Sequence, residues 1–302
     1  MARYSDTSGS EILFDLREGE INCTEVGAMR TRSYRAGDSL ELEVFPLTRV
    51  GAQAREEVKR RKSTPQQQEL NRKRTKKRIR RLAEENFDES CIHLTVTYDY
   101  GQVDRYRGSY ADTLRMWEEC GLPFDDVDVK HDIDLFVRRL RRAVIKAGGD
   151  PKLFKYLWVM ESTKEHPEDP NPLPPRYHVH MLLSAPGLSR EMIEETWGHG
   201  YANCKRLDLS KNGLEALCNY ITKQRKFVHR WGKSKNLREP DARVSDRKIS
   251  RRRAAMIARD VQYRGREILE QIYPGYRLES CEVKFSNFVS GAYIYARLRK
   301  IK

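Results

Sequence analysis

Polar and apolar residues alternate in two stretches near the middle of the chain, 91–98 and 177–183. Because successive side chains of a β-strand point to opposite faces, the apolar residues of each stretch should face a core and the polar ones the other side. Residues 153–161 are mostly apolar and predict a central strand that ends in the carboxylate of Glu161. Residues 198–206 predict a further strand.

Amphipathic helices are predicted between these strands. Residues 132–144 carry an apolar stripe and are followed by Gly148 and Gly149, a helix-stop signal. Residues 188–197 and 214–221 repeat the helical pattern. The resulting order of strands and helices is typical of an α+β domain, so we expect one antiparallel sheet with helices packed on one face. The other face would then be free for a ligand.

The flanking segments differ in texture from this central region, which we place at 87–240. Residues 1–48 contain an alternating strand pattern and predict a small β-rich lobe. Residues 49–86 form a basic helical segment, in which eight of the ten residues 72–81 are basic. Residues 241–302 predict a basic helix and two closing strands.

The overall charge points to a polyanionic partner. The chain has 302 residues, with 58 Lys and Arg against 44 Asp and Glu, and a formal net charge of +14. Nucleic acid is the first candidate, ahead of an acidic membrane surface. Because no run of eighteen apolar residues and no signal peptide is present, we expect a cytoplasmic protein without a membrane partner. The six scattered cysteines form no C-x-x-C pair, which argues against a zinc ribbon or a disulfide scaffold.

Two basic segments are candidates for nucleic-acid contact. A solvated helix is the alternative for 72–81, but like charges this dense favour phosphate contacts, and Leu70, Ile79 and Leu82 look too few to bury much. In residues 230–236, basic residues are interleaved with an aromatic one, as in a loop that contacts nucleic acid. The predicted contacts are Arg72, Lys73, Arg74, Lys76, Lys77, Arg78, Arg230, Lys233 and Lys235.

His178 and His180 would share one face of their strand and could bind one divalent cation together. Alternating strands also produce a His-x-His pair by chance. Glu161 is a third candidate ligand, because a hairpin between the two strands would bring its carboxylate beside both imidazoles; a solvent-facing strand end is the alternative. This donor set suits Mg²⁺ or Mn²⁺, although the ligand types also permit Zn²⁺.

Tyr220 and Lys223 lie three residues apart on a predicted helix and are therefore neighbours on its surface, away from its apolar stripe. Most tyrosines pack or form surface hydrogen bonds. Beside a lysine and a polarised phosphodiester, however, a phenol can act as a covalent nucleophile, and the lysine can neutralise developing charge. Because a phenolate is a moderate leaving group, the reverse step, rejoining, needs no external energy source.

These motifs, in this order, resemble those of the HUH endonucleases, specifically the single-tyrosine rolling-circle replication initiators. Residues 94–98 look like the first motif, His178-Val179-His180 like the His-hydrophobic-His motif, and Tyr220-Ile221-Thr222-Lys223 like the Tyr-x-x-Lys motif. Glu161 stands where related initiators carry a third metal ligand. The resemblance covers about residues 88–240.

The resemblance implies an RRM-like or ferredoxin-like sheet and site-specific nicking of single-stranded DNA at a replication origin. Tyr220 would form a 5′-phosphotyrosine link, and Thr95 and Thr97 of the first motif would contact DNA. The free 3′-hydroxyl would be extended by a host polymerase. A phosphate-binding G-x-x-x-x-G-K-[ST] motif is absent, so we expect dependence on a host helicase.

Two other interpretations remain open. A transposase or mobilisation relaxase of the same superfamily would differ mainly in its DNA substrate. A non-catalytic single-strand-binding module would explain the charge equally well, but it would not explain why Glu161, the paired histidines and Tyr220 with Lys223 occur together.

Overall fold

The computed structural model describes the chain in eight ranges, 23–50, 65–98, 126–162, 177–209, 213–223, 230–240, 242–285 and 289–301. These residues form two compact units. The first contains residues 1–73 and 239–302, and the second residues 74–238. The loop before the histidine strand, 163–175, and the start of the basic tail, 224–229, lie outside the described residues. Within the described ranges, no helix combines the length and apolarity needed to cross a membrane.

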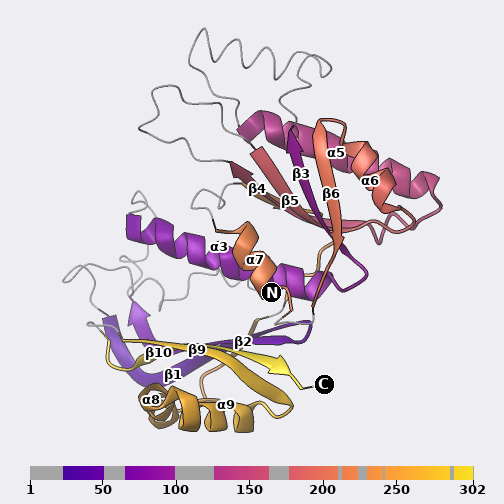
Figure 1. Ribbon diagram of the computed structural model, residues 1–302. Helices are drawn as coiled ribbons and strands as arrows, with labels where there is room; N and C mark the ends of the chain where they lie inside the picture. Colours follow the sequence, from indigo (N-terminus) through magenta and orange to yellow (C-terminus); the bar gives the residue numbers. More distant parts are fainter. Residues whose placement is uncertain are drawn as a thin grey trace. The chain divides into compact units, whose positions relative to one another are not determined.

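The second unit is built on a five-stranded antiparallel sheet in the order β6-β3-β5-β4-β7 (Figure 1). Four of its strands coincide with the predicted ones. The strands are β3 (Ile92–Tyr98), β4 (Lys155–Ser162), β5 (Tyr177–Ser184), β6 (Gly200–Arg206) and β7 (Trp231–Lys233). The α+β class predicted from the order of the elements is therefore confirmed.

Helices α5 (Asp126–Lys146) and α6 (Arg190–Trp197) cover one face of this sheet (Figure 1). Their apolar stripes meet the apolar side of the alternating strands in one core, where Phe136 and Trp197 pack edge to face with ring centroids 5.2 Å apart. The side chain of Ser189 accepts a hydrogen bond from the Met192 amide and so caps the start of α6.

Helices α3 (Pro65–Asn86) and α7 (Glu215–Ile221) pack on the other face, which was expected to be free. They cover the apolar part of that face, where Leu157, Val159 and Leu182 are fully buried. Only the rest of the face remains available to a ligand.

The C-terminal half of α3 is a core helix, contrary to the expectation that its apolar residues bury little. Ile79, Leu82 and Ala83 have no exposed surface. Their spacing of three and four residues places them on one stripe, and the basic residues occupy the remaining positions. A charged composition therefore hid an ordinary amphipathic helix.

Replacing Leu82 with alanine should lower the free energy of unfolding by about 2–5 kcal/mol, because the substitution leaves a cavity in a packed core. Ile145→Ala on α5 is the control, since that side chain is 56% exposed and its loss should change stability by less than about 0.5 kcal/mol. Urea denaturation of both variants measures the difference. Equal stabilities would show that α3 contributes little to the core.

The basic segment 230–236, predicted as a loop, contains the edge strand β7, which pairs with β4. Gly232 lies against the indole of Trp158, and a Cβ atom at this position would stand 2.6 Å from the ring. Glycine is therefore the residue that lets β7 approach β4. Ser234 continues the pairing by exchanging hydrogen bonds with the backbone of Tyr156.

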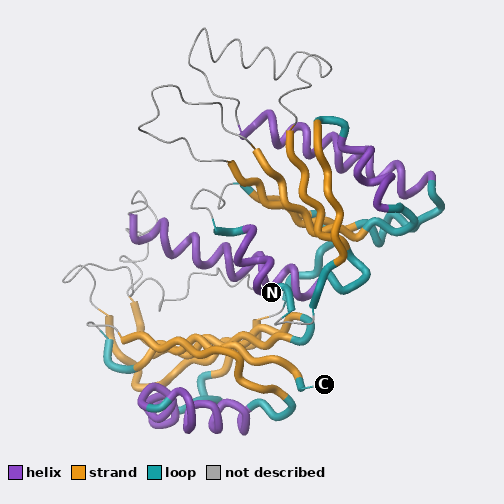
Figure 2. The backbone as a smooth tube through the Cα atoms, in the orientation of Figure 1, coloured by secondary structure: helices purple, strands orange, loops and turns teal. Residues whose placement is uncertain are grey.

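The first unit is a second five-stranded antiparallel sheet, in the order β8-β1-β2-β10-β9 (Figure 2). Its core is formed with the helices that follow β8. The elements are β1 (Cys23–Ala36), β2 (Ser39–Val50), β8 (Ala242–Ser245), α8 (Arg251–Arg259), the π-helix η3 (Val261–Gly265), α9 (Arg266–Ile272), β9 (Tyr276–Phe285) and β10 (Ala292–Lys300).

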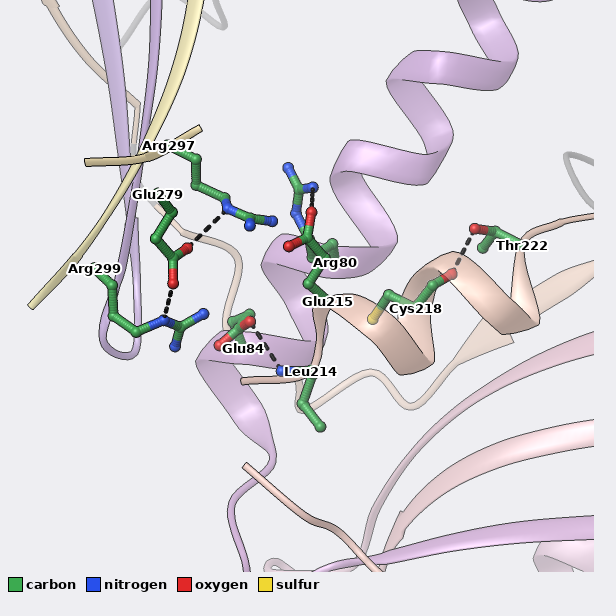
Figure 3. A network of polar contacts seen from close by, with 9 residues as sticks. All are labelled: Arg80, Glu84, Leu214, Glu215, Cys218, Thr222, Glu279, Arg297 and Arg299. Atoms are coloured by element: carbon green, nitrogen blue, oxygen red, sulfur yellow. Dashed lines mark hydrogen bonds and ion pairs between the residues drawn. The ribbon is translucent and has the colours of Figure 1, made fainter. Parts of the chain in front are cut away.

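This sheet joins segments from the two ends of the chain, which the sequence had suggested were separate. Val44 of β2 is the register partner of Ile294 of β10. Glu279 of β9 binds both Arg297 and Arg299 of β10 (Figure 3). Because Arg297 is only 4% exposed, its charge depends on that carboxylate for compensation.

Candidate active site

The strand register of the second unit aligns the predicted site residues in two rows that cross the sheet. In the first row, Thr97 pairs with His178, and His178 pairs with Glu161. In the second row, Thr95 pairs with His180. Strand β6 extends the rows with Tyr201 opposite Thr97 and Asn203 opposite Thr95. Cross-strand partners share a face of the sheet, so both rows lie on the side opposite α5 and α6.

The two threonines hydrogen-bond with the two imidazoles. Thr95 Oγ1 lies 3.2 Å from His180 Nδ1, and Thr97 Oγ1 lies 3.1 Å from His178 Nδ1. These contacts fix the orientation of each ring and leave Nε2 as the nitrogen that can bind another group. The sequence suggested DNA contacts for both threonines; their hydroxyl groups are used instead to orient the histidines.

Glu161 lies between the imidazoles and the lysine. Its Oε2 atom is 3.3 Å from His180 Nε2, and its Oε1 atom is 2.9 Å from Lys223 Nζ. The glutamate side chain is only 13% exposed, so the alternative of a solvent-facing strand end does not hold. The hairpin predicted from the sequence therefore brings this carboxylate beside the imidazoles.

Tyr220 stands directly over this group. Its ring packs edge-on against the imidazole of His180, with centroids 5.3 Å apart, and Lys223 Nζ lies 4.4 Å from the centre of the tyrosine ring. Tyr220 is half exposed, so a ligand on the sheet face can reach it. Residues of three separate elements, β4, β5 and α7 with its C-terminal extension, thus converge on one site.

Helix α3 holds the short helix α7 in place (Figure 3). Glu84 of α3 accepts a hydrogen bond of 3.1 Å from the backbone amide of Leu214, and Arg80 lies 3.6 Å from Glu215. At the other end, the buried hydroxyl of Thr222 donates to the carbonyl of Cys218. A seven-residue helix is marginal by itself, so these contacts help to position Tyr220.

Burial and charge determine the protonation of the site. Burial lowers the pKa of His180, and the hydrogen bond with Glu161 opposes this shift only in part, which favours the neutral ring that a metal requires. The hydrogen bond with Glu161 raises the pKa of Lys223, so the ammonium group stays charged at neutral pH.

His93 is a third imidazole beside the site, which sequence analysis left out of the candidate residues. Its ring stacks on His180 at 5.5 Å, and its buried Nε2 atom has no hydrogen-bond partner among the described residues. Burial, followed by the nearby His180 and Lys205, lowers the pKa of His93 to about 4. The signal was present, because His93 precedes Thr95 by two residues and therefore shares its face of the strand.

A divalent cation fits part of the predicted ligand set. Ligand atoms about 2.1 Å from an octahedral ion lie about 3 Å from their neighbours, and His180 Nε2 and Glu161 Oε2 are 3.3 Å apart. Within the described ranges, however, no three His, Cys, Asp or Glu side chains are grouped so that they could hold a metal ion. The pair formed by His180 and Glu161 is in place, and Lys223 occupies the second oxygen of Glu161.

The basic residues predicted to contact DNA are dispersed over α3 and the β7 region. Arg72 is bound to Glu69 of the same helix, and the Arg78 guanidinium lies 5.7 Å from the centre of the Trp231 ring. Arg230 is only 8% exposed and stacks over Tyr177, so its side chain packs inside the protein. The remaining residues lie on the same two elements or directly after β7: Lys73, Arg74, Lys76 and Lys77 on α3, Lys233 on β7, and Lys235.

Comparison with known proteins gives one match. No curated protein and no solved structure matches the chain. Residues 91–225 match the family described as replication-associated protein ORF2. This segment contains β3, both histidines, Glu161 and the helix that carries Tyr220. The part of the chain that forms the candidate active site is therefore similar to a family of replication-associated proteins.

Proposed function

We propose that this protein is a rolling-circle replication initiator that nicks and rejoins single-stranded DNA through Tyr220. The observation that carries the proposal is the convergence of a half-exposed phenol with Lys223, Glu161 and His180. The match of residues 91–225 to replication-associated proteins supports the same role.

In the proposed reaction, the Tyr220 oxygen attacks the scissile phosphorus while the bond from phosphorus to the 3′ oxygen breaks. The products are a 5′-phosphotyrosine and a 3′-hydroxyl, so overall one proton passes from the phenol to the leaving oxygen. Lys223 is close enough to Tyr220 to stabilise negative charge on the phenol oxygen. Attack by a 3′-hydroxyl on the phosphotyrosine reverses the step and rejoins the strand.

The residues that would hold a divalent cation are His178, His180 and Glu161. Mg²⁺ or Mn²⁺ suits this set of donors, and Zn²⁺ is compatible with it. When bound, the cation supplies Lewis-acid polarisation of a phosphate oxygen. The two threonines keep the imidazoles oriented for this purpose. A host polymerase and helicase are the partners that such an initiator requires.

Covalent trapping tests this function. The protein is incubated with a labelled single-stranded oligonucleotide library and Mn²⁺, and whatever remains attached after denaturation is sequenced. We expect one sequence to be strongly enriched, with the label joined to the protein through its 5′ phosphate. Binding without any covalent product would instead favour a non-catalytic single-strand-binding module.

Replacing Thr97 with valine should weaken Mn²⁺ binding about 10- to 100-fold, because His178 would lose the hydrogen bond that orients its ring. Thr97→Ser is the matched variant, since it keeps the hydroxyl and should restore most of the affinity. Titration with Mn²⁺, followed by the electron paramagnetic resonance signal of the free ion, measures the change. Unchanged affinity in Thr97→Val would remove His178 from the ligand set.

A further inference from the structure

Strand β6 presents an exposed column of side chains on the same face as the histidines. Tyr201, Asn203 and Lys205 point to this face, while Ala202 and Cys204 pack into the core with α5 and α6. Helices α3 and α7 cover apolar residues of β4 and β5 on this face, and they leave the three β6 side chains exposed. We call these three residues the β6 column.

Tyr201 occupies the end of the column nearest the candidate active site. It is the register partner of Thr97, whose other partner is His178. Because neighbouring strands are about 4.8 Å apart, Tyr201 lies two strands, or about 10 Å, from His178. The tyrosine is 70% exposed, which is unusual for a large aromatic side chain next to a buried imidazole site.

The other end of the column opens on a cavity of about 760 Å³, at the opposite end of the sheet. Four basic residues and one carboxylate line this cavity, which we call the basic cavity: Lys155, Arg190, Lys205, Arg206 and Asp88. The carboxylate is already engaged by the hydroxyl and amide of Ser90. In the described part of the chain, none of the four basic side chains forms an ion pair.

We propose that one strand of DNA runs along the β6 column, with a base stacked on Tyr201 and phosphates held at the basic cavity. The proposal deepens the proposed function, because it rests on the scissile phosphate lying beside His178 and Tyr220. From Tyr201 to Arg206 the strand covers about 16 Å, which corresponds to roughly five nucleotides at 3.4 Å each.

The chemistry of the two ends favours a nucleic-acid strand over a small anion. An aromatic ring on an open sheet face is a platform for any base. The described residues that line the basic cavity include no aromatic side chain, so the cavity can bind phosphate but offers no such platform. A single nucleotide could occupy only one of the two ends, whereas a strand of DNA occupies both.

The test of the aromatic end measures binding apart from cleavage, by fluorescence anisotropy with labelled oligothymidylate in EDTA, in protein that carries Tyr220→Phe. Tyr201→Ala should weaken binding roughly 5- to 150-fold, and Tyr201→Trp should restore it. Tyr263→Ala in the first unit is the matched control, since Tyr263 is 81% exposed and should not affect binding. Equal affinity for Tyr201→Ala and its parent would overturn the stacking role.

The basic end is tested by the salt dependence of the same binding. Lys205→Gln combined with Arg206→Gln should reduce the slope of log affinity against log salt by about 1.4, since each phosphate contact on a single strand contributes about 0.7. Arg138→Gln with Arg142→Gln removes two exposed charges from α5 and should leave the slope unchanged. Equal effects of both pairs would mean that charge acts diffusely and that the cavity is no binding site.

Two further outcomes separate this inference from the proposed function. Binding that depends on Tyr201, together with no covalent product from wild-type protein, would overturn nicking and support the β6 column. Nicking by wild-type protein, with binding and salt slope unaffected by the Tyr201, Lys205 and Arg206 substitutions, would overturn the β6 column alone. Because these three side chains are exposed, thermal melting should confirm that the variants stay folded.

Discussion

Replacing Tyr220 with phenylalanine should abolish covalent attachment of the protein to an oligonucleotide recovered by trapping. The substitution removes only the attacking oxygen, so product formation should fall on the order of 10³- to 10⁶-fold. The ring that packs against His180 remains, and the side chain is half exposed. Stability and DNA binding should therefore stay close to those of the wild type. A denaturing gel with 5′-labelled and 3′-labelled substrate measures the attachment and its polarity.

Tyr263→Phe provides the matched control for this experiment. Tyr263 is also an exposed tyrosine, but it belongs to the other unit of the chain. We expect its variant to form the covalent product at the wild-type rate. If Tyr220→Phe formed the product equally fast, the nucleophile would have to be another residue, and the contact with His180 would be only a packing contact.

The position of Lys223 gives this tyrosine a reactive environment that most exposed tyrosines lack. The ammonium group contacts the Glu161 carboxylate on one side and the Tyr220 ring on the other. An exposed ion pair by itself contributes little to stability, so the value of this one lies in placing a positive charge where a phenolate would form. That charge helps in both directions, because it stabilises the phenolate as attacking group and as leaving group.

The central sheet was predictable because its strands show the simplest periodicity. Alternation in 91–98 and 177–183 placed the threonines and histidines on one face, and the register confirms this. The pairing of β4 with β5 was harder to predict, because the fourteen-residue connection between them, 163–176, is too long to fix a register by turn geometry. The expectation that Glu161 faces the imidazoles depended on the hairpin alone.

The basic segments were harder to interpret because charge obscured their packing. In α3, a stripe of Ile79, Leu82 and Ala83 is sufficient to bury the helix, although basic residues surround it. Long basic side chains can cover apolar surface with their stems, so composition alone is a poor guide to exposure. In β7, a three-residue strand is too short to show a period, and the fit of Gly232 against Trp158 is visible only in three dimensions.

The first unit could not be assembled from local patterns. Its strands were individually predictable, but β2 and β10 are separated by more than half of the chain. Their pairing is set by a shared core, in which Leu42 and Ala296 are fully buried register partners. Periodicity reports which face of a strand is apolar, and it does not say which distant strand covers that face.

Replacing both His178 and His180 with alanine should remove metal-dependent nicking and weaken Mn²⁺ binding more than about 100-fold. Loss of a group that only orients a ligand costs about 10- to 100-fold, so loss of two ligands should exceed this range. Single-stranded binding in EDTA should change much less, because the proposed DNA contacts lie on β6. The measurements are Mn²⁺ titration by electron paramagnetic resonance and nicking as a function of Mn²⁺ concentration.

The control for this double variant must separate ligand loss from the loss of a buried side chain, since His180 is only 3% exposed. His93→Ala removes the neighbouring imidazole that stacks on His180 without being one of the proposed ligands. It should lower stability, while the Mn²⁺ affinity of the folded variant stays within about tenfold of the wild type, below the range for a group that orients a ligand. If His93→Ala weakened Mn²⁺ binding as much as the double variant does, the cation would have to be assigned to a different set of imidazoles.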